Sequence, residues 1–440
     1  MLNVSASGRF LVHDDGTPFF YLGDTGWAAI QRLSHQEVAQ YLQDRASKGF
    51  TVIQTVAISE FDGLTVPNPY GELPFANLDP TQPNDTYFRH IDDLVARASA
   101  LGMYVALLPT WGDKVGPVGW GTGPEVFTPQ NAERYGRYLG QRYRDAPIIW
   151  VVGGDRTPKE EHHFATWRAL ATGLDAGDGG RHLMTFHPQG RQSSSAVFHN
   201  DDWLDFNMIQ SGHRHRDFAN YTMIEHDYAL TPTKPIFDGE PCYEDHPVVD
   251  GEGYFGAYDA RRAAYWALFA GAFGHTYGAN GIFQCWRPGM ADRFGVRRSW
   301  QEALELPGAA QLCHARAILE SRPFLDRRPD QSLIVGDPGS GADHRRATRA
   351  ADGSYALIYS PTGRSFATDL GALSGERTIA HWYDPRTGNA TEAGAFATGT
   401  TQEFTPPSSG HDNDWVLVLD DPARGFPAPG QGKWVGQSTE

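Results

Sequence analysis

Short apolar runs alternate with longer amphipathic stretches from about residue 19 to about residue 320. The runs are rich in β-branched and aromatic side chains and are bounded by Gly or Pro, which is typical of buried β-strands. The stretches between them repeat apolar residues three or four positions apart, as at Ile91, Leu94 and Ala98. That spacing predicts helices that lay one face on a sheet. The alternation therefore indicates an α/β fold with parallel strands.

Eight strands and seven helices are predicted in this region. Ser34 and Thr128 have the residue type and position of helix N-caps, and Pro129 suits a first helical position. The predicted strands cover 19–22, 51–57, 103–108, 148–155, 183–186, 206–209, 235–240 and 274–278. The predicted helices cover 34–48, 86–100, 128–143, 160–172, 219–230, 258–270 and 301–319.

Eight strand–helix units in about 300 residues favour a (β/α)8 TIM barrel over a doubly wound sheet. The first strand is followed by Gly23-Asp24-Thr25-Gly26, which lacks the three-glycine spacing of a dinucleotide-binding turn. The barrel is therefore predicted over residues 1–324.

The pattern changes after Arg322-Pro323. Strand-like runs separated by turn residues follow at the spacing of an all-β sandwich. A β-sandwich domain is predicted over residues 325–425, followed by a Pro- and Gly-rich tail at 426–440. The runs lie at 332–335, 354–359, 379–383 and 415–419.

Composition limits the partners of the chain. It has 440 residues and a formal net charge of −16, which argues against nucleic acid and anionic membrane surfaces. No apolar stretch approaches the roughly 20 residues of a membrane helix. The first residues, Met1 to Ser5, lack a basic segment followed by an apolar run, so no signal peptide is predicted. The oligomeric state is left open, as is the compartment, either the cytoplasm or a trimmed secreted form.

Two carboxylates stand where predicted strands end. Asp155 closes the fourth strand and Glu240 closes the seventh. The carboxyl ends of barrel strands form the mouth in which active sites lie, and a pair of carboxylates there suits cleavage of a glycosidic bond. The structural alternatives are a helix N-cap or an ion pair with Arg156 for Asp155, and a turn before Pro241 for Glu240.

Other polar and aromatic residues follow the remaining strands. Carboxylates and amides bind sugar hydroxyls, and aromatic rings cover the apolar C–H faces of sugars. Each residue alone is more often a loop cap or a core residue, but their recurrence at successive strand ends favours a carbohydrate site. The candidate substrate-binding residues are Asp24, Trp27, Glu60, Trp111, His187, Gln210, His213, Asn280 and Gln284.

The sequence lacks the motifs of other kinds of catalytic or cofactor-binding site. The sequence has no His-Glu-x-x-His segment and only three widely spaced cysteines, so no metal site is predicted. It also lacks the Gly-x-Ser-x-Gly turn of a serine nucleophile and any Gly-rich phosphate loop. No cofactor is expected.

Several segments together resemble the apiosidase-like family, glycoside hydrolase family 140. They are Tyr21-Leu22-Gly23-Asp24-Thr25, Gly153-Gly154-Asp155-Arg156, Asp238-Gly239-Glu240-Pro241 with Tyr243-Glu244, and Gly274-His275-Thr276-Tyr277-Gly278. The resemblance covers the barrel and extends to the C-terminal β domain, which in the family resembles a collagen-binding module.

This resemblance implies a retaining β-glycosidase with Asp155 as acid/base and Glu240 as nucleophile. It further implies action at apiose in the side chains of the pectin rhamnogalacturonan II. The alternatives are another β-glycosidase specificity, such as an arabinofuranosidase or glucosidase, and a non-catalytic carbohydrate-binding protein.

One position departs from the broader clan of similar barrels, whose members commonly place Asn before a Glu acid/base. Here Gly154 precedes the shorter Asp155. We therefore expect Gln210 or His187 to contact the hydroxyl beside the anomeric carbon, and we expect a sugar other than an ordinary glucoside.

Overall fold

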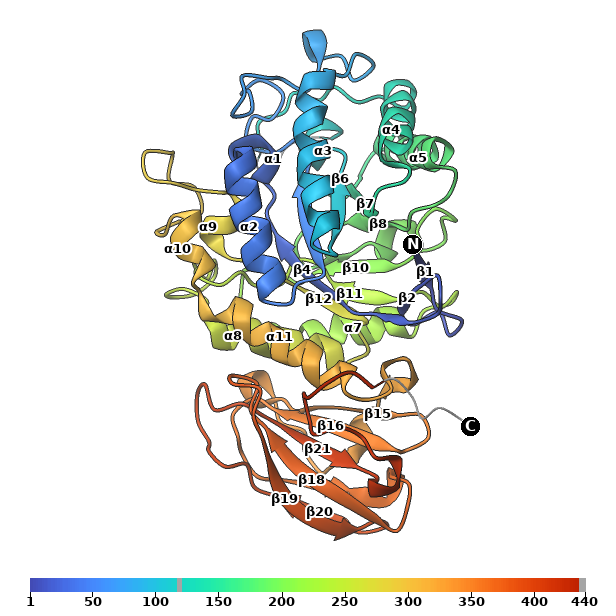
Figure 1. Cartoon of the computed structure of the whole chain (residues 1–440), viewed down its shortest axis with the longest axis vertical. Coiled ribbons are helices and arrows are strands. Elements are labelled where there is room, and N and C mark those ends of the chain that lie inside the picture. Colours follow the sequence, from blue (N-terminus) through green and yellow to red (C-terminus); the bar gives the residue numbers. More distant parts are fainter. Residues whose placement is uncertain (117–120, 435–440) are drawn as a thin grey trace.

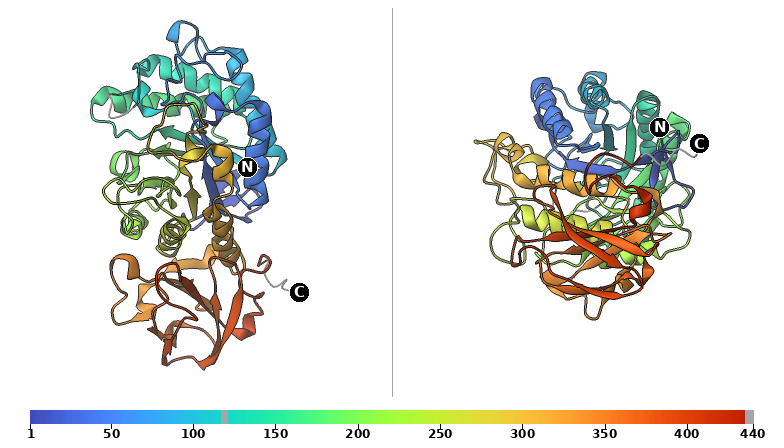
Figure 2. Two further views of the ribbon diagram at one scale, coloured as in Figure 1. Left: turned by 90° about the vertical axis from the view of Figure 1, so that its left-hand side faces the viewer. Right: turned by 60° about the horizontal axis from the view of Figure 1, so that its bottom comes forward.

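The computed structural model describes residues 1–116 and 121–434. Helices surround a barrel of parallel strands in the first three quarters of the chain, and antiparallel sheets follow (Figure 1). The other views show these sheets packed against one side of the barrel (Figure 2). Within the described residues, no helix is both long enough and apolar enough to cross a membrane.

Eight parallel strands form the barrel, which confirms the predicted fold. Strand β12 pairs with β4, β8 lies beside β10 to complete the barrel, and the short strand β9 (Gln192–Ser193) runs antiparallel beside β10. The parallel strands are β4 (Tyr21–Thr25), β5 (Val52–Val56), β6 (Tyr104–Leu108), β7 (Ile148–Gly153), β8 (Met184–His187), β10 (Asn207–Gln210), β11 (Ile236–Asp238) and β12 (Gly274–Tyr277).

The helices begin where the caps were predicted. Ser34 forms a capping box with Glu37, and Thr128 forms one with Asn131 ahead of Pro129. The helices are α1 (Ala29–Arg32), α2 (His35–Ser47), α3 (Asp85–Ala100), α4 (Pro129–Tyr143), α5 (Glu161–Asp178), α6 (Ser195–Phe198), α7 (Asn220–Tyr228), α8 (Ala257–Phe269), α9 (Asn280–Phe283), α10 (Trp300–Leu304) and α11 (Pro307–Glu320).

Some elements differ from the prediction. The helix predicted at 301–319 is two helices, α10 and α11, because Pro307 cannot continue the first and starts the second. The N-terminal sheet of β1 (Leu2–Val4), β2 (Leu11–His13) and β3 (Pro18–Phe19) was not predicted. Short 3₁₀ helices cover Ala76–Leu78, Gly112–Lys114, Phe324–Asp326, Gln331–Leu333, Gly341–Asp343, Leu370–Ala372 and Pro422–Arg424.

Two antiparallel sheets enclose the second core. Leu333, Trp382 and Leu417 lie in this core. One sheet has the order β13 (Arg327–Pro329), β15 (Arg346–Ala350), β16 (Tyr355–Ser360), β21 (Trp415–Asp420), β18 (Arg377–Tyr383) and β19 (Ala390–Ala397). The other has the order β14 (Ile334–Val335), β17 (Phe366–Asp369) and β20 (Thr401–Phe404).

The segment after the last strand packs on the barrel as far as it is described. The Trp434 amide donates to the Glu320 carbonyl, and the Trp434 ring contacts the Phe426 ring. Residues 435–440 of the predicted tail lie outside the described residues.

Buried polar contacts join the barrel to the C-terminal sheets. Helices α8 and α11 lie between the two parts (Figure 1). Arg261 on α8 is 1% exposed and donates to both carboxylate oxygens of Asp414, at 3.1 and 2.7 Å. Beside it, the rings of Tyr265 and Tyr359 stack at 4.8 Å. Bidentate pairing of this kind fixes the orientation of the two parts.

Removing the Arg261 side chain should destabilise this interface. Arg261→Ala leaves the Asp414 carboxylate buried without its bidentate partner, which costs about 3–5 kcal/mol. We expect a urea titration to show that loss. Arg89→Ala is the control, because Arg89 forms an exposed pair with Asp85 on α3 and should leave the unfolding midpoint nearly unchanged. Equal midpoints for the two variants would contradict this account.

Candidate active site

A left-handed turn carries Asp155 from the end of β7 into the barrel mouth. Gly153, Gly154 and Asp155 all have positive φ, at 97°, 133° and 51°. A Cβ on Gly153 would lie 2.7 Å from the His187 carbonyl oxygen, and one on Gly154 would lie 2.9 Å from the Gly112 nitrogen. Glycine is therefore required twice, and Asp155 holds a conformation that is uncommon for a side-chain-bearing residue.

The turn aims the Asp155 backbone at a histidine. The Asp155 N–H donates to His187 Nδ1 at 3.1 Å. Arg156 Nη1 donates to the Asp155 carbonyl at 2.6 Å and lies 3.4 Å from its Oδ2. The ion pair with Arg156 that was weighed as an alternative is thus present, although its nitrogen–oxygen distance is long.

Three N–H groups surround the carboxylate of Glu240, which follows β11. His187 Nε2 lies 2.8 Å from Oε2, His213 Nε2 lies 3.1 Å from Oε1, and Gln210 Nε2 donates to Oε1 at 2.9 Å. Glu240 is 6% exposed. A buried carboxylate needs such donors, because burial removes the water that would otherwise stabilise its charge.

The backbone assigns the tautomer of both histidines. His187 Nδ1 accepts from the Asp155 N–H, and His213 Nδ1 accepts from the Tyr243 N–H at 3.3 Å. A ring nitrogen that accepts carries no proton, so the proton of each neutral ring lies on Nε2. Both histidines therefore donate to Glu240 through Nε2.

These contacts favour an ionised Glu240. Burial raises the pKa of its carboxyl, but the hydrogen bonds from His187 and His213, together with the electrostatic attraction of these two side chains, lower it by more. The net pKa lies below the ordinary value of a glutamate. Glu240 is thus negatively charged near neutral pH, in the state required of a nucleophile.

Asp155 and Glu240 line one cavity of about 520 Å³. One wall is aromatic: Trp27 contacts Trp111 at 5.4 Å between ring centroids, and Trp27 Nε1 donates to the Tyr243 hydroxyl. Phe283, Phe294 and Val249 also line the cavity, and Arg191 and Arg214 add positive charge to it. Rings, amides and carboxylates in one pocket suit a sugar with apolar C–H faces and polar hydroxyls.

Models of two protein families match the chain. The model described as "Apiosidase-like, catalytic domain" matches residues 5–326. This chain belongs to the apiosidase-like family. A second model, "Putative collagen-binding domain of a collagenase", matches residues 328–420 of the C-terminal sheets.

Two similar solved structures extend over nearly the whole chain. A glycoside hydrolase family 5 protein from Bacteroides vulgatus ATCC 8482 is 36% identical, with a TM-score of 0.89 and coverage of 97% of this chain and 94% of that one. A protein described as a glycoside hydrolase is also 36% identical, with a TM-score of 0.88 and coverage of 96% and 97%. None of the curated proteins compared with this chain matches it.

The apiosidase-like chain is therefore a glycosidase, and its substrate is a carbohydrate. This confirms the predicted family and enzyme class, and it disfavours the alternative of a non-catalytic binding protein. Another Bacteroides vulgatus ATCC 8482 protein, 16% identical with a TM-score of 0.70 over 96% of this chain and 82% of that one, shares the fold.

Most of the predicted site residues meet at this pocket. Asp155, Glu240, Trp27, Trp111, Gln210 and His213 line it. His187 is fully buried and reaches it through Glu240.

The structure does not bring Asp24 to the pocket. Its carboxylate accepts from the Tyr41 hydroxyl at 2.5 Å and pairs with Arg45 at 3.0 Å. Asp24 and Arg45 are fully buried, so the pair joins β4 to α2. Glu60 is not among the lining residues either: it accepts from the Ser59 hydroxyl, and burial raises its pKa to about 8.

Asn280 and Gln284 do not line the pocket, but they contact a segment that does. Asn280 Nδ2 donates to the Phe294 carbonyl, while Gln284 Nε2 donates to Asn280 Oδ1 and to the Arg293 carbonyl. They hold the segment that carries Phe294 into the cavity. In that way they shape the site without lining it.

Several lining residues were not predicted. Tyr243 comes three residues after Glu240, within a segment that already pointed to the family. Arg191, Arg214, Val249 and Phe294 come from loops, where no periodicity marks an inward-facing position. Among the described residues, no group of three or more His, Cys, Asp or Glu is arranged to hold a metal ion.

Removing one donor should raise the pKa of Glu240. His213→Ala leaves Gln210 and His187 in place, and losing one hydrogen bond to a charged group should raise this pKa by about one unit. Glu240 would then take up its proton at a higher pH than in the wild type. Carbon-13 NMR of labelled glutamate carboxyls can measure the pKa, with Glu240→Gln identifying the resonance.

The control for this measurement is His215→Ala. His215 lies two residues away and is half exposed beside Asp250, at 3.6 Å. The pKa of Glu240 should not change in that variant. An unchanged pKa in His213→Ala would contradict the role assigned to the His213 donor.

Proposed function

We propose that this glycosidase acts with retention of configuration, with Glu240 as nucleophile and Asp155 as acid/base. The observation that carries the proposal is the shell of three N–H donors around Glu240, in the pocket that Asp155 also lines. A nucleophilic carboxylate must be ionised, and these donors favour that state.

The first step transfers one proton and exchanges one bond. Asp155 gives its proton to the glycosidic oxygen while a Glu240 oxygen attacks the anomeric carbon, so the bond to the leaving oxygen breaks and an ester bond to Glu240 forms. Oε1 already accepts from His213 and Gln210, whereas Oε2 accepts from His187, which leaves a lone pair on Oε2 for the attack.

The second step uses water. Asp155, now ionised, removes a proton from a water molecule as its oxygen attacks the anomeric carbon. The ester bond to Glu240 breaks, the sugar leaves, and both carboxyl groups return to their starting states.

Gln210 has a second role in this proposal. Its Nε2 donates to Glu240, while its buried Oε1 has no hydrogen-bond partner among the described residues. A sugar hydroxyl beside the anomeric carbon can supply the missing donor. His187 was the other candidate for this contact, but both of its nitrogens are already occupied.

The proposed substrate is a β-apioside in the side chains of rhamnogalacturonan II. Its support is the family to which the chain belongs and the Gly154-Asp155 sequence, in which a short acid requires the leaving oxygen to lie close to the end of β7. An arabinofuranosidase or a glucosidase would share the carboxylate pair and differ in the sugar that fits the pocket.

Kinetics on aryl glycosides test the specificity and the nucleophile together. The wild type should hydrolyse an aryl β-apioside faster than the arabinofuranoside or the glucoside. Glu240→Ala should lower kcat by about ten-thousand-fold or more with the fold intact, because the covalent step is lost. NMR of the first-formed product should show retained anomeric configuration. Inversion, or near-wild-type turnover by Glu240→Ala, would overturn the proposal.

The acid role of Asp155 predicts a dependence on the leaving group. Asp155→Ala should lower the rate of glycosylation by about 10²–10⁴-fold for natural glycosides, whose leaving oxygen needs a proton. A dinitrophenyl glycoside needs little protonation and should keep most of that rate. Pre-steady-state kinetics isolate this step. The same loss with every leaving group would rule out the acid role.

A further inference from the structure

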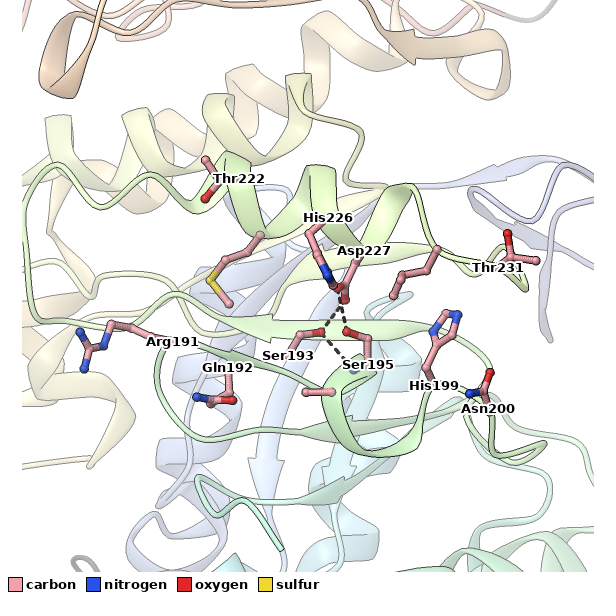
Figure 3. Close-up of a pocket in the computed structure, with 13 residues that line it drawn as sticks. Arg191, Gln192, Ser193, Ser195, His199, Asn200, Thr222, His226, Asp227 and Thr231 are labelled. Carbon is pink, nitrogen blue, oxygen red and sulfur yellow. Dashed lines mark hydrogen bonds and ion pairs between the residues drawn. The ribbon is translucent and has the colours of Figure 1, made fainter. Parts of the chain in front are cut away.

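A second hollow of about 520 Å³ lies on the outer side of the barrel. It runs between helix α7 and the segment formed by β9 and α6 (Figure 3). We call it the lateral groove. Its two sides are residues 191–200 and residues 222–231.

The lateral groove exists because one covering helix is very short. Helices α2 to α5, which cover the first strands of the barrel, have between 13 and 18 residues. Helix α6, between β8 and β10, has 4 residues. Such a short helix cannot cover the outer face of a strand, so this part of the barrel stays open beside α7.

Arg191 joins the lateral groove to the catalytic pocket, since it lines both. Its backbone has a φ of 61°, and its N–H donates to the Gln210 carbonyl at 2.6 Å. Gln210 in turn donates to Glu240. On either side of Arg191, Gly190 lines the pocket and Gln192 lines the groove. The chain thus passes directly from one hollow to the other.

The floor of the groove is held by a buried carboxylate. Asp227 on α7 accepts from the hydroxyls of Ser193 and Ser195, at 2.5 and 2.7 Å, and pairs with His226 (Figure 3). These bonds fix β9 and α6 against α7. They also satisfy the charge of Asp227, the one acidic side chain among the described residues that line the groove.

The remaining lining offers the groups that bind sugars. Gln192, Asn200 and Thr231 are exposed and carry amides or a hydroxyl, while Met223 and Leu230 add aliphatic surface. Amides and hydroxyls exchange hydrogen bonds with sugar hydroxyls, and aliphatic side chains contact C–H faces. The chain has a net charge of −16, yet this surface presents Arg191 and amides instead of free carboxylates.

We propose that the lateral groove is a second carbohydrate subsite. It binds an extension or branch of the same glycan whose scissile bond lies between Asp155 and Glu240, and the glycan passes Arg191 on its way from the pocket. This inference rests on the proposed function for its substrate, but it concerns a different surface. Its ligand is a hydroxyl-rich oligosaccharide longer than the sugar that is cleaved.

A bulky substitution in the lateral groove tests the second subsite without altering the catalytic pocket. Ala196→Trp places a large ring in the groove, at a position that does not line the catalytic pocket. We expect KM for rhamnogalacturonan II to rise about tenfold or more. Kinetics on an aryl β-apioside, which occupies the pocket alone, should change less than twofold. Ala176→Trp, at an exposed alanine on α5, controls for an added surface tryptophan.

A binding measurement does not depend on turnover. Titration calorimetry of Glu240→Gln with rhamnogalacturonan II should show Kd rising about tenfold when Ala196→Trp is added, and severalfold with the milder Asn200→Ala. Circular dichroism checks folding. Equal Kd values with and without these changes, or no binding of the polysaccharide, overturn the second subsite. Failure to hydrolyse any β-apioside overturns the proposed specificity instead.

Discussion

A carboxylate that stays charged inside a protein has to be surrounded by donors, and this site is built around that requirement. Glu240 accepts from His187, His213 and Gln210, and the backbone N–H groups of Asp155 and Tyr243 decide which nitrogen of each histidine donates. His187 thereby connects the two carboxylate residues, since it accepts from the backbone of one and donates to the side chain of the other. The left-handed turn at Gly153 and Gly154 makes this connection possible, because it directs the Asp155 N–H inward.

Barrel register brings these groups together. Gly153 pairs with His187 between β7 and β8, and Ile209 pairs with Asp238 between β10 and β11. A shift of one residue in either pair would turn the side chains of that strand to the opposite face. Gln54 on β5 reaches across the interior and donates to the Gly239 carbonyl, next to Glu240. The C-terminal sheets support the same region from outside through Arg261 on α8, because α8 packs against β11 and β12.

The parts of the site that could be predicted are those fixed by strand ends. Apolar runs located all eight barrel strands, and Asp155 and Glu240 followed from where β7 and β11 stop. Asp24 was placed at the mouth by the same reasoning. Its partners, however, are Tyr41 and Arg45 on the inner face of α2. Helix periodicity does not reveal that a buried arginine will pair with a carboxylate at a strand end. The turn that aligns His187 with Asp155 was equally hidden, because it depends on three consecutive positive φ angles. The short α6 and the groove beside it also left no mark in the hydrophobic pattern.

The short acid and the groove are linked by geometry. An aspartate reaches less far than a glutamate, so in the proposed mechanism a leaving oxygen protonated by Asp155 has to lie close to the end of β7. The neighbouring strand there is β8, and the chain after β8 continues through Gly190 to Arg191. A leaving group held near β7 therefore departs on the side of the barrel where Arg191 opens into the lateral groove. The short side chain of Asp155 thus also favours a glycan that continues along β9.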